Sequence, residues 1–369
     1  MRTAVIIIPT YNEAGNIKEL IEGIFKSTSY SKTWQIEVLF VDSQSSDNTP
    51  ELIKNEQKSN KHIHLLSTKK EGLGKAYVAG FKYAIDTLKA YLVFEMDADL
   101  SHNPSDIPKF LKHIESGSDF VVGSRYIPGG SIPSNWGLHR KIFSRCANLF
   151  VKYGFMKRNI TDWTDGYRAI KVWVVKSAMS HISKYSGYVF QIALLDHAVK
   201  HNARISEVPV HFKDRNYGNS KINALQYIVQ TVVYVLTNSP FIKFAVVGLI
   251  GFVLDFGITH FLIIQNNVSN WIATPISTES AIISNFLMNN YWSFSHKKLQ
   301  QSRLGYIFKF LKFNFISSGS ILIQTIGIGV LTHFFGKDNL LYYKAGIIML
   351  IIIPYSYILY NKFIWKEKK

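Results

Sequence analysis

The carboxyl-terminal part of the chain is unusually apolar for a soluble domain. Beyond Pro240, four successive stretches are each about long enough to cross a bilayer as a helix, which takes roughly 20 apolar residues. These stretches are residues 244–264, 272–292, 313–335 and 343–361. The second is more polar than the others, and a soluble helical bundle is the alternative interpretation. The sequence therefore predicts an all-α membrane domain with four transmembrane helices over residues 241–369.

Basic residues predict the orientation of this domain. They lie between the second and third stretches and after the fourth, whereas the opposite loops carry little charge. The residues are Lys297, Lys298, Arg303, Lys309, Lys312, Lys366, Lys368 and Lys369. Cytoplasmic loops are enriched in Lys and Arg, and the apolar run near the amino terminus is too short for a signal peptide. We expect a multi-pass membrane protein with its amino-terminal half and both termini in the cytoplasm.

The charge balance limits the classes of partner. The formal net charge is +17, which suits nucleic acid, anionic lipid or phosphorylated substrates. No nucleic-acid-binding module is visible, and many basic residues flank the apolar segments. The composition therefore favours a lipid bilayer and phosphate-bearing ligands, and we expect no nucleic-acid partner.

The amino-terminal half alternates short apolar runs with helical periodicity. Buried strands are predicted at residues 4–8, 36–41, 63–66, 91–96 and 120–122, and amphipathic segments lie between them. Alternation of this kind predicts right-handed βαβ units. The expected fold of this half is a Rossmann-like α/β domain with a mostly parallel sheet.

Polar residues follow the predicted strands at the positions where ligands bind in such sheets. They are residues 9–13, Asp42, residues 97–99 and Arg125. Asp97 and Asp99 lie two residues apart after a buried strand, and two such carboxylates suit Mg²⁺ or Mn²⁺ beside a substrate diphosphate. An Asp-x-Asp pattern alone is weak, but its place after a strand strengthens it. We expect a metal and nucleotide site here.

Other features allow two interpretations each. Residues 222–236 form an amphipathic helix that lies either along the membrane or against the soluble domain. The glycines of residues 72–74 either approach a phosphate or form a turn. The basic loop at residues 214–221 either clamps a diphosphate or meets lipid headgroups. Asp255 and Glu279, inside predicted spans, are either functional groups or packing partners.

The motifs resemble a known family, the dolichol- or polyprenol-phosphate mannose synthases among the family 2 glycosyltransferases of GT-A fold. Six segments occur in that family's order across residues 1 to about 235, and the remainder resembles a small GtrA-type membrane domain. The segments are residues 8–13, 96–102, 123–126, 187–191, 207–209 and 214–221. The resemblance implies three parts: a GT-A domain at 1–220, an interfacial helix or linker at 221–240, and the membrane domain at 241–369.

Site roles follow from the same resemblance. The implied catalytic residues are Asp97, Asp99 and Arg125. The implied nucleotide-sugar contacts are Pro9, Tyr11, Glu13, Phe40, Asp42, Asp97, Ala98, Asp99, Arg125, Arg215 and Lys221. The implied metal ligands are Asp97, Asp99 and Ser101, and the implied acceptor-phosphate contacts are Arg125, Arg140 and Ser144. Residues 162–168 resemble the family's Asp-x-Thr-Ser-Gly-Phe-Arg segment, with Asp165 as the main departure.

The implied reaction is the metal-dependent, inverting transfer of mannose from GDP-mannose to dolichyl or polyprenyl phosphate. An ionised phosphate acceptor needs no strong general base, so positioning, metal charge and arginine contacts carry the catalysis. One alternative is transfer of glucose or N-acetylglucosamine from a UDP-sugar. Another, of a different class, is a flippase or transporter of lipid-linked sugars, for which Asp255 and Glu279 are the only support.

Overall fold

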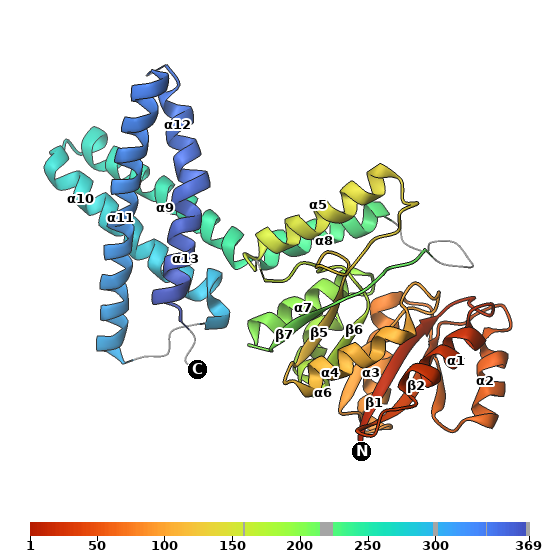
Figure 1. Cartoon of the computed structure of the whole chain (residues 1–369). Helices are drawn as coiled ribbons and strands as arrows, with labels where there is room; N and C mark the ends of the chain where they lie inside the picture. The colour runs from red at the N-terminus through yellow and green to blue at the C-terminus, as the bar shows by residue number, and fades with distance from the viewer. Residues whose placement is uncertain (158, 215–223, 298–301, 337, 367–369) are drawn as a thin grey trace. The chain divides into compact units, whose positions relative to one another are not determined.

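The computed structural model describes the chain except residues 158, 215–223, 298–301, 337 and 367–369 (Figure 1). The chain forms two compact units, Met1–Val235 and Leu236–Lys369. The amphipathic segment expected over residues 222–236 is helix α8 (Ala224–Asn238), most of which belongs to the first unit.

A single seven-stranded sheet forms the centre of the first unit. Its strand order is β3-β2-β1-β4-β6-β5-β7, and β6 runs antiparallel to both of its neighbours while the other pairs are parallel. The strands are β1 (Arg2–Thr10), β2 (Trp34–Asp42), β3 (Ile63–Ser67), β4 (Leu92–Glu95), β5 (Phe120–Ser124), β6 (Arg168–Lys171) and β7 (Ile205–Pro209). All strands except β6 therefore end at the same edge of the sheet.

Most helices of this unit cover the sheet, whereas the helix between β5 and β6 and the helix after β7 lie to one side of it (Figure 1). The helices are α1 (Ile17–Thr28), α2 (Thr49–Ser59), α3 (Leu73–Asp86), α4 (Ile107–Glu115), α5 (Leu138–Gly154), α6 (Val172–Ile182), α7 (Val189–Lys200) and α8 (Ala224–Asn238), with a 3₁₀ turn η1 (Pro104–Asp106) before α4. In α1, the apolar side chains Ile17, Leu20 and Ile24 are fully buried, because they recur at helical spacing on the face that meets the sheet. The hydrophobic core thus lies between sheet and helices.

Strand β1 shows how the sequence produces a central strand. Residues 4–8 are all fully buried, as expected of an apolar β-branched run in a parallel sheet covered on both faces. Pro9, which cannot donate a ladder hydrogen bond, lies beyond the last residue of β1 that pairs with β4. A proline in a central strand is tolerated here because only β2 accompanies β1 at this point.

The predicted α/β fold with a mostly parallel sheet is confirmed, and the five predicted strands correspond to β1–β5. Two further strands, β6 and β7, were not predicted. Both are short and carry charged residues, Arg168 and Lys171 in β6 and Glu207 in β7, so neither shows the apolar run of a buried strand. Their neighbours in the sheet, rather than their own sequences, specify them as strands.

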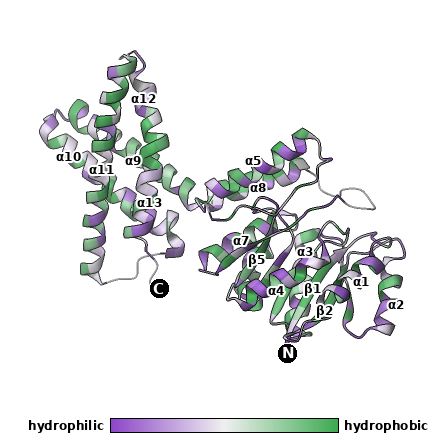
Figure 2. Ribbon diagram, viewed as in Figure 1, coloured by the Kyte–Doolittle hydropathy of each residue, from purple (hydrophilic) through white to green (hydrophobic). Residues whose placement is uncertain are grey.

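All secondary-structure elements among the described residues of the second unit are helices. Its elements are α9 (Pro240–His260), η2 (Phe261–Gln265), α10 (Asn270–Met288), η3 (Asn289–Ser293), η4 (Ser295–Lys297), α11 (Arg303–Phe335), α12 (Leu340–Ile347), η5 (Ile348–Ile352) and α13 (Ile353–Phe363). Three segments are long and apolar enough to cross a membrane: Pro240–Gln265, Leu304–Phe335 and Tyr342–Phe363. The second predicted span corresponds to α10, which is not one of these three segments and in which polar and apolar residues are mixed (Figure 2).

Aromatic side chains pack the interior of this unit at one end. Trp365 is fully buried, stacks on Phe294 at 4.6 Å between ring centroids, and donates a 3.1 Å hydrogen bond from Nε1 to Asn290. The two carboxylates inside predicted spans both meet a neighbouring helix. Asp255 accepts a 3.1 Å hydrogen bond from Thr278, and Glu279 accepts one of 3.5 Å from Asn314.

Candidate active site

The sheet opens beyond the shared end of β1 and β4. β1 pairs with β2 as far as Thr10, but its pairing with β4 stops at Ile7 and Glu95. Because β1 has β2 on one side and β4 on the other, this is the point at which the strand order reverses. Open α/β sheets bind ligands at such switch points.

A cavity of about 480 Å³ occupies this opening. Its lining comes from the turn after β1, the start of α3, the turn after β4, the segment before α7, and α8. The residues are Pro9, Thr10, Tyr11, Glu13, Ser43, Lys70, Glu71, Gly72, Leu73, Ala76, Asp97, Ala98, Asp99, Ser186, Gly187, Tyr188, Gln226, Tyr227 and Gln230. Six of the residues that the resemblance implied for the nucleotide sugar are therefore brought together: Pro9, Tyr11, Glu13, Asp97, Ala98 and Asp99.

Two other implied contacts lie beneath the cavity rather than in its lining. Phe40 is fully buried in the hydrophobic core. Asp42 is 2% exposed, and its carboxylate accepts hydrogen bonds from Thr10 Oγ1 at 3.1 Å and from the Ser45 N–H at 3.0 Å. In this structure Asp42 fixes the turn after β2 against the end of β1.

Three turns at the strand ends contain a residue in the left-handed conformation. Asn12, Gln44 and Leu100 follow β1, β2 and β4, with φ of 56°, 58° and 62°. The conformation is costly for a bulky residue such as leucine and persists only where the surroundings enforce it. The strain at Leu100 lies directly after the Asp97–Asp99 pair and marks this turn as a functional candidate.

The turn after β4 supplies oxygen atoms suited to a hard cation. Asp97 and Asp99 line the cavity, and Oδ1 of Asp99 accepts a 3.1 Å hydrogen bond from the Ser101 N–H. The Ser101 hydroxyl is buried and has no hydrogen-bond partner among the described residues. The described residues contain no cluster of three or more His, Cys, Asp or Glu side chains able to hold a metal. Two carboxylates fit Mg²⁺, which completes its coordination with water and substrate phosphates.

His102 stabilises the turn that follows β4. Its Nδ1 accepts a 3.0 Å hydrogen bond from the Asp97 N–H, and its ring stacks on Tyr167 at 4.9 Å between centroids. Its Nε2 lies 3.9 Å from an Asp97 carboxylate oxygen and 3.8 Å from Asp165 Oδ1. His102 therefore connects the carboxylate pair to the loop that contains Asp165.

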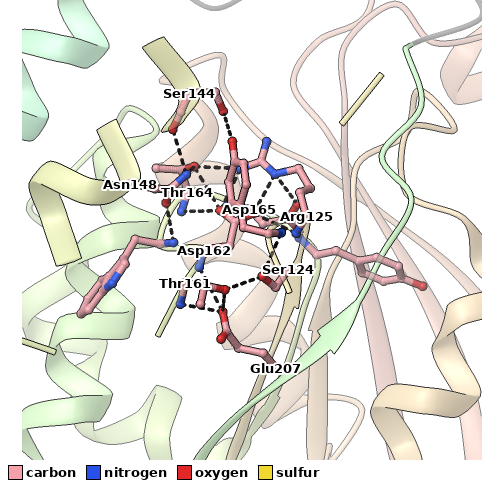
Figure 3. Close-up of polar contacts among 12 residues, drawn as sticks. Ser124, Arg125, Ser144, Asn148, Thr161, Asp162, Thr164, Asp165 and Glu207 are labelled. Carbon is pink, nitrogen blue, oxygen red and sulfur yellow. Dashed lines mark hydrogen bonds and ion pairs between the residues drawn. The ribbon is translucent and has the colours of Figure 1, made fainter. Parts of the chain in front are cut away.

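A buried guanidinium forms the second half of the site (Figure 3). Arg125 donates from Nε and Nη2 to the two carboxylate oxygens of Asp162, at 2.7 and 2.8 Å, and from Nη2 to Thr164 at 2.8 Å. Its Nε also lies 3.3 Å from Asp165. Nη1 has no hydrogen-bond partner among the residues that the structure describes. The arginine is thus held rigidly while one nitrogen stays available.

Burial and charge act in opposite directions on the carboxyls around Arg125. Burial would raise the pKa of Asp162, but the guanidinium of Arg125 outweighs burial and lowers it below its ordinary value. For Asp165, burial dominates and raises the pKa above its ordinary value despite Arg125. The ion pair of Arg125 with Asp162 is therefore the principal charge interaction of this cluster.

Residues far apart in the sequence hold the loop that carries Asp162 (Figure 3). Asn148 in α5 accepts a hydrogen bond from the Trp163 N–H at 2.7 Å and donates to Thr164 at 3.1 Å. Glu207 in β7 accepts from the N–H groups of Thr161 and Asp162 at 2.9 and 3.0 Å. Sequence reasoning missed the role of Asn148, and a polar residue on an otherwise amphipathic helix was the only signal for it.

Arg168 stabilises the end of this loop that leads into β6. It is fully buried and donates to the backbone carbonyls of Asp165, Gln191 and Trp163 at 2.8, 2.6 and 3.0 Å. Nε of Arg168 lies 3.7 Å from the carboxylate of Glu95, and burial raises the pKa of Glu95 to about 7. Arg168 therefore ties the loop and α7 to the strand that ends at the carboxylate pair.

The other implied acceptor contacts lie on or beside α5. Ser144 shares a 2.6 Å hydrogen bond with the Tyr126 hydroxyl, next in sequence to Arg125. Arg140 is half exposed, lies over the Trp136 ring at 3.9 Å, and has Nη1 3.3 Å from Asp214. The structure thus places Ser144 close to Arg125 and leaves Arg140 at the surface. Arg215 and Lys221 lie outside the described residues.

The glycines before α3 allow a close backbone approach. Gly74 donates a 2.8 Å hydrogen bond to Ser186 O, and a Cβ on Gly74 would clash with Tyr185 O. The backbone that approaches Gly74 closely is therefore that of the segment before α7. Gly72 also lines the cavity. Lys70, which sequence reasoning missed, lies over the Tyr11 ring at 3.6 Å and places a positive charge in the cavity.

Comparisons with known families agree with this geometry. Residues 5–178 match the family described as glycosyl transferase family 2. Residues 243–365 match the transmembrane domain described as GtrA/DPMS. The first match contains both the carboxylate pair and the Arg125 cluster, and the second contains the apolar helices of the second unit.

Curated relatives extend over most of the chain. A dolichol-phosphate mannosyltransferase of Pyrococcus furiosus is 31% identical and covers 95% of this chain and 96% of its own length. A polyprenol monophosphomannose synthase of Mycolicibacterium smegmatis is 34% identical and covers 59% of this chain and 80% of its own. An undecaprenyl-phosphate mannosyltransferase of Micrococcus luteus is 34% identical and covers 59% of this chain and 86% of its own length. The first relative thus matches over the length of both units, whereas the other two match over 221 and 218 residues, slightly less than the length of the first unit.

Proposed function

Because this chain belongs to the dolichol-phosphate mannosyltransferase family of the family 2 glycosyltransferases, we propose that it transfers mannose from GDP-mannose to dolichyl or polyprenyl phosphate. One observation carries the proposal. The carboxylate pair in the cavity and the buried Arg125 are joined through His102 and Asp165 by separations of 3.9, 3.8 and 3.3 Å. A donor diphosphate and an acceptor phosphate would therefore lie side by side.

The donor fits the cavity between the turns of β1 and β4. Pro9, Tyr11 and Glu13 frame the nucleoside, and Lys70 supplies positive charge toward its phosphates. Asp97 and Asp99, with the Ser101 hydroxyl, would hold Mg²⁺ or Mn²⁺ and so neutralise the departing diphosphate. The Asp97 N–H bonded to His102 fixes the turn before substrate arrives, which reduces reorganisation during the reaction.

The acceptor phosphate fits against Arg125. Asp162 holds the guanidinium in a fixed orientation, and Nη1 remains able to donate to a phosphate oxygen. Ser144, with Arg140 nearer the surface, extends this site along α5. An ionised phosphate oxygen attacks the anomeric carbon directly and displaces the nucleoside diphosphate with inversion, so no side chain needs to remove a proton.

The second unit makes this a membrane protein, and we propose that it holds the catalytic unit at the cytoplasmic face. Under the positive-inside rule, the basic residues between α10 and α11 and after α13 favour a cytoplasmic location for both termini. Helix α8 exposes Leu225, Val229 and Val233, an apolar face suited to the bilayer surface from which a lipid phosphate arrives.

A side-by-side donor assay tests the proposal. Membranes containing the full chain receive polyprenyl phosphate and GDP-mannose, UDP-glucose or UDP-N-acetylglucosamine, each labelled in the sugar, with Mg²⁺ or with chelator. We expect lipid-linked label from GDP-mannose alone, only with metal, and with release of one nucleoside diphosphate per transfer. Transfer from a UDP-sugar instead would overturn the donor assignment, and no nucleotide release from any donor would overturn the enzymatic role.

A further inference from the structure

Helix α8 presents two chemically different faces. Leu225, Ile228, Val229, Val233 and Leu236 are exposed apolar residues. Gln226, Tyr227 and Gln230 instead line the cavity that we assign to the donor. Spacings of three and four residues place these polar side chains on one side of the helix.

A buried tyrosine fixes the rotation of α8 about its own axis. Tyr234 is 2% exposed, and its hydroxyl donates a 2.8 Å hydrogen bond to Asp196 in α7. The same hydroxyl lies 3.1 Å from Nε2 of His181 in α6. Tyr234 follows Gln230 by four residues and Tyr227 by seven, so anchoring it turns the polar side of α8 toward the cavity.

The segment before α7 makes room for these side chains. A Cβ on Gly187 would lie 2.8 Å from Oε1 of Gln230, so a larger residue would displace the glutamine. The Tyr188 ring lies 5.9 Å from the Tyr227 ring. Gln230 and Tyr227 therefore contact the cavity wall at defined positions rather than project freely into solvent.

The polar side of α8 lies near the place where the sugar of the donor would bind. Burial raises the pKa of Tyr227 to about 12, so its hydroxyl stays protonated at neutral pH, and Tyr227 interacts electrostatically with Arg168, Arg125 and Asp162. The turn of β1 bounds the cavity where the nucleoside would bind, and Asp97 and Asp99 bound it at the diphosphate. In a nucleotide sugar the hexose lies beyond the diphosphate, so with the donor placed as proposed above it would lie toward Arg125, the residue with which Tyr227 interacts.

We propose that Gln226, Tyr227 and Gln230 bind the hexose of the donor, an inference that rests on the function proposed above. Each glutamine amide offers donors and an acceptor, and the tyrosine adds an apolar ring face with one hydroxyl, a combination suited to a neutral polyhydroxylated ring. Pro240 begins span α9 two residues after α8 ends. The wall that recognises the sugar thus continues directly into the first membrane segment.

Comparing a nucleotide sugar with its bare nucleotide tests this assignment. The full chain in detergent with Mn²⁺ is titrated calorimetrically with GDP-mannose and with GDP, for wild type, Gln226→Ala and Gln230→Ala. Loss of one neutral hydrogen bond corresponds to about a 3- to 10-fold weaker affinity. We expect each variant to lower the affinity for GDP-mannose by that factor and to change the affinity for GDP less than about twofold. Val229→Ala, on the exposed side of the same helix, should change neither affinity.

The GDP titration also shows whether each variant is folded. If a variant lowers the affinities for GDP-mannose and GDP equally, or lowers neither, the assignment of this face to the hexose is overturned. If wild type binds a UDP-sugar instead of GDP-mannose, the proposed donor is wrong, but the comparison is repeated with that UDP-sugar and UDP. The inference about α8 therefore fails or survives separately from the identity of the donor.

Discussion

Nε2 of His102 lies 3.8 Å from Oδ1 of Asp165, and Oδ2 of the same carboxylate lies 3.3 Å from Nε of Arg125. Asp165 occupies the position where the resembled family segment has serine. The structure shows how this chain accommodates the extra buried charge: it lies between an imidazole and a guanidinium and accepts the Tyr167 N–H at 2.7 Å. The carboxylate is therefore a link between the two halves of the site.

The two aspartates beside Arg125 should differ sharply in importance. Asp162→Ala leaves a buried guanidinium without its bidentate partner, which costs roughly 3–5 kcal/mol. Asp165→Ser removes a carboxylate whose Oδ2 has no hydrogen bond and retains a short acceptor for Tyr167. We expect a melting temperature roughly 6–20 °C lower for Asp162→Ala and nearly unchanged for Asp165→Ser. Equal losses in a thermal-unfolding experiment would contradict the pairing of Arg125 with Asp162.

Removal of a carboxylate at the predicted metal site should abolish transfer without unfolding the chain. Asp99→Asn keeps the side-chain shape but removes the charge that would hold the cation, so we expect at least about a 100-fold lower rate of transfer. The measurement is lipid-linked label formed per minute across a series of Mn²⁺ concentrations. Asp86→Asn, an exposed position outside the cavity, is the matched control. Full activity of Asp99→Asn would remove Asp99 from the metal site.

Arg125→Lys should weaken the acceptor step in particular. Lysine keeps the charge but cannot make the paired contacts with Asp162 while also reaching a phosphate. We expect the KM for polyprenyl phosphate to rise and kcat/KM for that substrate to fall about 10- to 100-fold, with little change in donor affinity. Initial rates over a range of acceptor concentrations decide this. Arg204→Lys, an exposed arginine paired with Asp119, provides the control.

Local sequence patterns predicted the part of the site that lies at strand ends. Asp97 and Asp99 follow a buried apolar strand, and Pro9 and Tyr11 follow another, so their meeting at one edge follows from parallel strands alone. Phe40 and Asp42 show where this reasoning stops. The strand pattern identified β2, but it did not reveal that one side chain enters the core and the other caps a turn.

The remaining site residues depend on contacts between distant segments. Asn148 and Glu207 bind the same loop from α5 and β7, and no spacing in the sequence connects them with Asp162. Gln226 and Gln230 belong to a helix whose apolar residues identified it as amphipathic. The sequence left open whether this helix lies along the membrane or against the soluble domain, and only packing through Tyr234 shows that its polar face meets the cavity.

Glu37 should make the catalytic unit sensitive to acid. Burial alone would raise its pKa, but hydrogen bonds with His64 at 2.7 Å and His62 at 2.9 Å outweigh burial and lower it from 4.5 to about 2. A carboxyl whose pKa is lower in the folded state stabilises the fold above its unfolded pKa, and this stabilisation is lost as pH falls through the folded pKa. Roughly 3 kcal/mol present at pH 7 should therefore disappear between about pH 5 and pH 2.

Thermal unfolding of wild type and Glu37→Gln across this pH range tests that expectation. The variant should melt at a lower temperature at pH 7, and the difference should shrink as the pH falls because protonation removes the same interaction from wild type. Glu56→Gln serves as the matched control, since this partly exposed glutamate lies in α2 and not in the cluster around Glu37. A constant difference between wild type and Glu37→Gln from pH 7 to pH 3 would show that the charge of Glu37 is not what stabilises this edge of the sheet.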